Sequence, residues 1–319
     1  MTYAYDPEIQ PWISMLPTLD VTDLAAARAF TAAMIEQLPP FELPAGLTLE
    51  RRTVPGPDGA PDVPILVFAP TEHNGERPAL VYGHGGGFVL GDAEGEKALP
   101  AQIAAEVGAV VISVDYRLAP EHPFPAPVED YYAVLRWTAK NAAALGVDPA
   151  RIAVGGVSAG AGLAAATALL ARDRGGPELC FQLLDIPVLD DRLDTPSMRE
   201  FTDTPLWNLP NAIHSWRHYL GPRQEDDPVS PYAAPARATD LSGLPPAYVS
   251  VCEFDPLRDE GIAYAQRLVQ HGVPTELHLF PGTFHGSGGA LPMAGVSQRM
   301  RAELIDATRR GLAPRPAGA

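Results

Sequence analysis

Residues 152–172 read Ile-Ala-Val-Gly-Gly-Val-Ser-Ala-Gly-Ala-Gly-Leu-Ala-Ala-Ala-Thr-Ala-Leu-Leu-Ala-Arg. An apolar run typical of a buried strand leads into Gly-Val-Ser-Ala-Gly at 156–160, and an Ala-rich segment typical of a helix follows at once. Ser158 therefore lies in a sharp turn from strand to helix, where Gly156 and Gly160 leave room for close backbone approach. This context predicts that Ser158 is a nucleophile. The alternative is a tight Gly/Ser turn that only joins strand to helix.

Strand-like and helix-like segments alternate along the rest of the chain. Because strands that are apolar almost throughout are buried on both faces, the alternation predicts an α/β fold with a mostly parallel central sheet and helices on both faces. The predicted strands are residues 63–69, 79–83, 109–115, 152–157, 181–186, 247–251 and 275–280, and the predicted helices are residues 95–107, 128–145, 159–172, 257–271 and 296–312.

Two segments do not fit this alternation. Residues 1–45 have a helical pattern before the first predicted strand, and residues 187–225 form a long insertion between two strands. An insertion of that length is uncommon unless it carries a function. We therefore expect residues 1–45 and 187–225 to pack together as a helical cap over the carboxyl ends of the strands, on a catalytic core of residues 46–186 and 226–319.

The composition of the 319-residue chain excludes several classes of function. Its net charge of −16 disfavours nucleic acid and an anionic membrane surface as partners. No apolar run approaches the roughly 20 residues that span a bilayer. No secretory signal is visible, and Cys180 and Cys252 lack metal or redox spacing, so we expect buried cysteines in a cytoplasmic protein. The acidic clusters at 190–194 and 225–227 lack the spacing of a calcium loop, so no metal or other cofactor is predicted.

A glycine-rich loop follows the predicted strand at 79–83. Residues 83–88 read Gly-His-Gly-Gly-Gly-Phe, and consecutive glycines allow a loop to aim its N–H groups inward. An oxyanion formed during acyl transfer needs such donors, each worth ~3–4 kcal/mol of barrier. Gly85, Gly86 and Gly87, with the N–H of Ala159 after the nucleophile, are the candidates. A phosphate-binding loop is the alternative, but the spacing it requires is absent. We expect His84 to be structural.

A serine nucleophile needs an adjacent base. In hydrolases with this strand–turn–helix nucleophile, an acid and then a His follow the Ser along the chain. Three of the eight histidines follow Ser158 outside the suspected cap. His271 ends a helix and His278 lies inside a strand, whereas His285 follows a strand on a loop. We therefore expect His285 to be the base; the alternative is a solvated loop histidine.

The acid that orients the base is expected after the predicted strand at 247–251. Asp255 lies on the loop there, just before a helix that begins near a proline. Asp259 falls in the first helical turn, where a carboxylate is common because the helix dipole favours it. Glu253 lies closer to the strand and is the second choice.

These motifs together resemble the hormone-sensitive-lipase-like esterases (bacterial family IV) of the α/β-hydrolase fold. The matching stretches are His-Gly-Gly-Gly-Phe at 84–88, Asp-Tyr-Arg-Leu-Ala-Pro-Glu-His-Pro-Phe-Pro-Ala at 115–126, Gly-Val-Ser-Ala-Gly at 156–160, Asp-Pro-Leu-Arg-Asp-Glu-Gly at 255–261 and His-Gly at 285–286. The resemblance implies a Ser158–His285–Asp255 triad, an oxyanion hole at Gly85, Gly86, Gly87 and Ala159, and a structural role for residues 115–126. One departure is Val157, where the family usually has Asp.

The resemblance also implies the activity, a carboxylesterase that cleaves short- to medium-chain acyl esters through an acyl-enzyme. An arylformamidase, lactonase or amidase on the same triad, or a non-catalytic ligand receptor, is the alternative. The expected partner is a small-molecule ester, with a homodimer possible. Candidate pocket residues are Phe88, Val157, Trp207, Leu209, Ile213 and Phe284.

Overall fold

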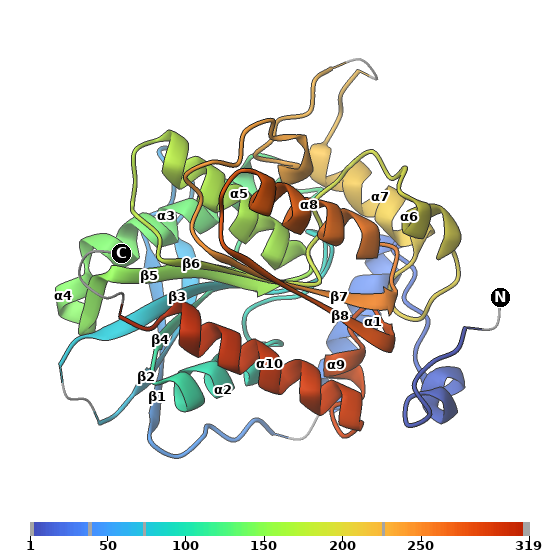
Figure 1. Cartoon of the computed structure of the whole chain (residues 1–319), viewed down its shortest axis with the longest axis horizontal. Helices are drawn as coiled ribbons and strands as arrows, with labels where there is room; N and C mark the ends of the chain where they lie inside the picture. Colours follow the sequence, from blue (N-terminus) through green and yellow to red (C-terminus); the bar gives the residue numbers. More distant parts are fainter. Residues whose placement is uncertain (1–2, 38–39, 73–74, 225–226, 315–319) are drawn as a thin grey trace.

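The computed structural model describes residues 3–37, 40–72, 75–224 and 227–314. A central sheet of eight strands has the order β1-β2-β4-β3-β5-β6-β7-β8 (Figure 1). β2 pairs antiparallel with β1 and β4, and every other neighbouring pair is parallel. The predicted α/β-hydrolase fold is therefore confirmed. The strands are β1 (Leu47–Val54), β2 (Val63–Pro70), β3 (Arg77–Gly83), β4 (Val110–Val114), β5 (Val147–Val157), β6 (Phe181–Asp185), β7 (Ala247–Phe254) and β8 (Thr275–Phe284).

Helices cover both faces of the sheet (Figure 1). α3 (Ala126–Lys140), α5 (Ala159–Asp173) and α8 (Arg258–Gln270) lie on one face, and α2 (Ala98–Val107) and α10 (Gly295–Gly311) lie on the other. The predicted helix over 128–145 is divided into α3 and the short α4 (Ala142–Leu145). α9 (Ser287–Ala290) precedes α10. Among the helices in the described part of the chain, none combines the length and apolarity needed to cross a membrane.

The sequence analysis missed β1. This edge strand is buried only at its two end residues, and its middle reads Thr-Leu-Glu-Arg-Arg-Thr. An edge strand with polar side chains lacks the apolar run that marks the inner strands, and β1 is instead defined by its pairing with β2.

The carboxyl ends of six parallel strands meet at one edge of the sheet. β3 to β8 all run parallel to one another, so the residues that follow them are brought together. In open α/β sheets this edge is where ligands bind. The glycine-rich loop, Ser158, Asp255 and His285 all follow strands of this set.

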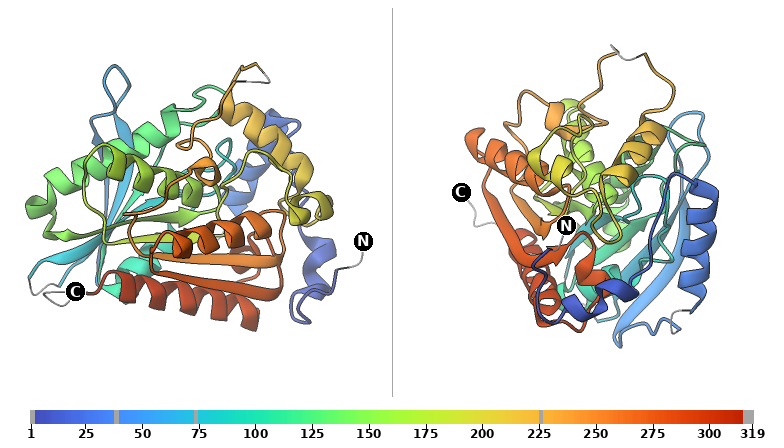
Figure 2. Two further views of the ribbon diagram at one scale, coloured as in Figure 1. Left: turned by 45° about the horizontal axis from the view of Figure 1, so that its top comes forward. Right: turned by 90° about the vertical axis from the view of Figure 1, so that its right-hand side faces the viewer.

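The segments outside the alternation lie at this same end of the molecule (Figure 2). The N-terminal segment contains η1 (Gln10–Met15) and α1 (Leu24–Gln37), and the insertion contains α6 (Pro196–Glu200) and α7 (Leu209–Leu220). The short η2 (Pro235–Arg237) follows the insertion. Asn211 of α7 links them: its Oδ1 accepts the N–H of Val21 at 3.1 Å and its Nδ2 donates to Leu19 O at 2.9 Å. The connection from β6 to β7 runs over residues 186–246, well beyond 187–225.

Candidate active site

Ser158 occupies the turn between β5 and α5 in a strained backbone conformation. Its φ of 56° and ψ of −117° are unusual for a residue with a side chain. The turn is possible because two neighbours are glycines. A Cβ on Gly160 would lie 2.1 Å from the carbonyl oxygen of Gly83, and a Cβ on Gly156 would lie 2.5 Å from that oxygen. The close packing of β3 against this turn fixes the position of the Ser158 hydroxyl.

Ser158, His285 and Asp255 form a continuous hydrogen-bonded chain. Ser158 Oγ lies 2.9 Å from His285 Nε2, and His285 Nδ1 lies 2.8 Å from Asp255 Oδ2. Because an ionised carboxylate only accepts hydrogen bonds, Nδ1 carries the proton and Nε2 is left to accept the Ser158 hydroxyl. The second Asp255 oxygen accepts the N–H of Leu257 at 2.9 Å, which holds the carboxylate in place. All three side chains are almost fully buried.

The alternative acids and bases form hydrogen bonds with groups other than Ser158 and His285. His271 Nδ1 bonds a main-chain carbonyl at the end of α8, and His278 Nε2 bonds a glutamate on the same strand. Glu253 accepts the N–H of Gly282, and Asp259 accepts the N–H of Ser197. Each group therefore has a structural partner, whereas the imidazole of His285 reaches Ser158.

The glycine-rich loop presents unengaged N–H groups beside Ser158. Gly86 and Gly87 have φ values of 115° and 59°, which glycine adopts readily. Their N–H groups donate to no other residue in the described part of the chain. Ala159 is the first residue of α5, so its N–H has no partner within the helix. Gly85 differs from the expectation: its N–H donates to Glu96 Oε2 at 2.7 Å and is not available to an oxyanion.

Side chains on two other elements hold the loop in place. The rings of His84 and Tyr116 stack with centroids 4.1 Å apart, and the Tyr116 hydroxyl donates to the His84 carbonyl at 2.8 Å. Burial lowers the pKa of His84, so its imidazole is neutral. From α7, the Ser215 hydroxyl donates to the Gly87 carbonyl. His84 therefore stabilises the loop and is not a second base.

A cavity of about 530 Å³ opens onto Ser158 and His285. Of the predicted pocket residues, its wall contains Val157 and Trp207. The Trp207 indole lies directly over the loop, because a Cβ on Gly87 would meet it at 2.3 Å. Both segments outside the core contribute to the wall, which includes Leu19, Thr31 and Ile35 from the first and Leu206 and Trp207 from the second.

Four predicted pocket residues lie outside this wall. Phe88 is buried with its ring stacked on Tyr219, centroids 3.9 Å apart, because the space between α5 and α7 must be filled. Phe284 is buried against the ring of Tyr5. Leu209 is partly buried and packs against buried hydrophobic side chains of the core. Ile213 lies on α7 and does not reach the cavity.

Four charged residues of the wall, Asp92, Glu96, Asp185 and Arg301, were not predicted. Burial raises the pKa of Glu96 to about 7, opposed by hydrogen bonds from the Gly85 N–H and the Tyr82 hydroxyl. Burial also raises the pKa of Asp185, against the bond from the Ser250 hydroxyl. Arg301 reaches the wall from α10. A signal existed only for Asp185, the one charged residue of a short buried strand that ends at the ligand-binding edge.

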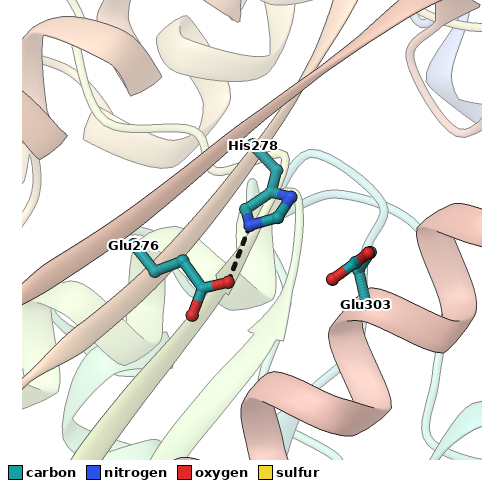
Figure 3. Close-up of side chains that lie close together, drawn as sticks. All are labelled: Glu276, His278 and Glu303. Atoms are coloured by element: carbon teal, nitrogen blue, oxygen red, sulfur yellow. Dashed lines mark hydrogen bonds and ion pairs between the residues drawn. The ribbon is translucent and has the colours of Figure 1, made fainter.

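The ligand atoms of one group of side chains lie close enough together to hold a metal ion. Ligand atoms of Glu276, His278 and Glu303 lie within 4.8 Å of one another, between β8 and α10 (Figure 3). The group is partly exposed, and Arg310 donates two hydrogen bonds to Glu276. Arg310 thus already supplies the positive charge that a metal would bring, and we assign no metal to this group.

The other acidic clusters and the cysteines have ordinary surroundings. Asp190 and Asp191 are held by the guanidinium groups of Arg192 and Arg237. Residues 225–226 of the second cluster lie outside the described residues. Both cysteines are buried, as expected.

Comparison with known proteins identifies the family. A sequence profile of the alpha/beta hydrolase fold matches residues 80–288. The chain belongs to this family. It is 44% identical over 286 residues to carboxylesterase NlhH of Mycobacterium tuberculosis, covering 88% of this chain and 89% of the relative. Ethyl acetate hydrolase of Pseudomonas putida is 34% identical, with 70% of each chain covered. The structure of a bacterial heroin esterase superimposes with a TM-score of 0.94 at 52% identity, covering 98% of this chain and 99% of that one.

Proposed function

We propose that this chain is a carboxylesterase that hydrolyses short- to medium-chain acyl esters. The observation that carries the proposal is the hydrogen-bonded chain from Ser158 through His285 to Asp255, beside unengaged N–H groups. In this proposal Ser158 is the nucleophile, His285 the base, and Asp255 the residue that orients the imidazole. Carboxylesterase NlhH, which is 44% identical, supports the same assignment.

The reaction proceeds in two half-reactions. Ser158 Oγ attacks the ester carbonyl carbon while His285 Nε2 takes the hydroxyl proton. The resulting oxyanion accepts hydrogen bonds from the N–H groups of Gly86, Gly87 and Ala159. When the intermediate collapses, the bond to the alcohol oxygen breaks and His285 protonates that oxygen. Water then attacks the acyl-enzyme, again with His285 as base, and releases the acid and free Ser158.

The dimensions of the cavity support a small substrate. A volume of about 530 Å³ is in the range of small-molecule sites. In the proposal, residues 1–45 and 187–225 act as the cap, because Ile35 and Trp207 narrow the cavity from opposite segments. A relative whose name gives ethyl acetate as its substrate supports a short ester. A cytoplasmic location and a homodimer stay predictions.

Hydrolysis of p-nitrophenyl acetate, butyrate, octanoate and palmitate tests the proposal. We expect the two short esters to be cleaved fastest, palmitate to resist, and Ser158→Ala to lose activity on all of them. Ser242→Ala, a matched change on the surface, serves as the control. A folded wild type that cleaves no ester would favour a narrow amide or lactone specificity, or a receptor. Full activity in Ser158→Ala would contradict the assignment of the nucleophile.

A further inference from the structure

The cavity that contains Ser158 and His285 carries an uneven set of charges. Among its described wall residues, Asp92, Glu96 and Asp185 are acidic, and Arg301 is the one Lys or Arg side chain. Asp92 is exposed, whereas Glu96 and Asp185 are partly buried. In the proposed function the ester enters this cavity, because Ser158 lies in its wall. The charges then indicate what this ligand carries.

Asp185 lies beside the nucleophile. It is the last residue of β6 and the Cα partner of Val157, which directly precedes Ser158. One carboxylate oxygen of Asp185 accepts the hydroxyl of Ser250. The other oxygen accepts no hydrogen bond from any residue that the structure describes.

Arg301 offsets the charge of this carboxylate only from a distance, because its positive charge lowers the pKa of Asp185 without a direct hydrogen bond. Its guanidinium donates to Gln102 Oε1 at 2.8 Å and to the carbonyl of Gly288, and it forms no ion pair with Asp185 within the described residues. Glu96, two residues before α2, lines the same cavity, and the negative charge of Asp185 raises the pKa of the Glu96 carboxyl. Carboxylates with little access to water are unfavourable unless a cation or several donors pair with them. Since Asp185 lines the cavity, a donor on the ligand can bond its second oxygen in place of water.

We propose that the preferred ester carries a protonated amine, which donates to Asp185 and is held between Asp185 and Glu96. The proposal rests on the esterase function proposed above. It places the cation on the face of the sheet covered by α2 and α10, since Glu96, Asp185 and Arg301 all lie there. The chain's net charge of −16 also attracts cationic substrates and repels anionic ones at long range.

Two pairs of esters of matched shape test the proposal at pH 7.5. In the first pair, 2-(dimethylamino)ethyl acetate carries the cation on the alcohol, and 3-methylbutyl acetate is its neutral counterpart. In the second pair, ethyl 4-(dimethylamino)butyrate carries the cation on the acyl chain, and ethyl 5-methylhexanoate is neutral. We expect kcat/KM to favour the cationic member by about tenfold or more in one pair, because the ammonium pairs with carboxylates of low solvent exposure. The pair that shows the preference identifies which side of the ester enters this part of the cavity.

Variants connect the preference to the carboxylate. In Asp185→Asn we expect the cation-to-neutral ratio to fall toward unity, whereas Asp62→Asn, the same charge change at an exposed position, leaves the ratio as in wild type. Inhibition of the wild-type enzyme gives a measurement that needs no variant. 2-(Dimethylamino)ethanol should compete with p-nitrophenyl acetate more strongly than 3-methyl-1-butanol, or 4-(dimethylamino)butanamide more strongly than 5-methylhexanamide.

The outcomes separate this inference from the esterase proposal. Equal rates within both pairs, or a preference that survives in Asp185→Asn, would overturn the assignment of the cation site while leaving the esterase intact. If none of the four esters and no p-nitrophenyl ester is cleaved, the proposed function fails and this inference fails with it.

Discussion

Replacing Glu96 by Gln removes a buried carboxyl group and keeps its shape. The amide oxygen of the glutamine can accept the N–H of Gly85, and its amide nitrogen can donate to the hydroxyl oxygen of Tyr82. Burial raises the pKa of Glu96 from its ordinary value of 4.5 to about 7 in the folded protein. The folded state thus binds this proton more tightly than the unfolded state.

The sign and size of the effect follow from this difference. The proton's contribution to stability is fully present below pH 4.5 and is lost as the pH rises through 7. At 1.36 kcal/mol for each unit of pKa, wild type should lose about 2.5 kcal/mol of unfolding free energy from this group between pH 5 and pH 8. Glu96→Gln lacks the group, so its stability relative to wild type should rise by that amount over the same interval.

Urea unfolding followed by tryptophan fluorescence measures both proteins at pH 5 and pH 8. Glu42→Gln, on the surface, is the matched control and should track wild type at both pH values. If the unfolding free energies of Glu96→Gln and wild type differ by the same amount at pH 5 and pH 8, the reasoning is refuted. The Glu96 carboxyl would then have the same pKa in the folded and unfolded states.

Three further predictions concern the triad, the turn and the cavity. Asp255→Asn should lower kcat for p-nitrophenyl butyrate by about 10⁴-fold, through loss of the correct imidazole tautomer, whereas Glu253→Gln should retain most activity. Gly160→Ala should cost more than about 3 kcal/mol in thermal unfolding because its Cβ has no space, whereas Gly289→Ala, with nothing within 4 Å of the added Cβ, should unfold near wild type. Trp207→Ala should raise kcat/KM for the octanoate relative to the butyrate, and an unchanged ratio would show that Trp207 does not limit chain length.

The sequence predicts the fold and the central chemistry because both depend on local patterns. Ser158 is marked by glycines that the backbone needs, and His285 by its place after a strand in a fixed chain order. Seven of the strands coincide with segments that the sequence predicts, most of them apolar runs. β1 is not visible in this way, because pairing with β2, and not an apolar pattern, makes it a strand.

The rest of the site depends on contacts between distant residues. The sequence offers Gly85 as an oxyanion donor, but it does not show that Glu96 accepts the Gly85 N–H. It places Phe88 next to the glycine loop, but it does not show that the ring is needed to fill the space beside Tyr219. The sequence does not show that Asp185 lies next to Val157 and Ser158, because this proximity comes from the pairing of β6 with β5.

Covalent trapping tests the central claim, that Ser158 is the nucleophile. An organophosphate with a p-nitrophenolate leaving group reacts with an activated serine and releases p-nitrophenolate. The absorbance of the released p-nitrophenolate gives the number of serines that have reacted. We predict one equivalent of phenolate per chain, a matching mass increase on the peptide that contains Ser158, and loss of esterase activity in proportion to labelling. Label on another residue, or esterase activity that persists when Ser158 is fully modified, would contradict the account.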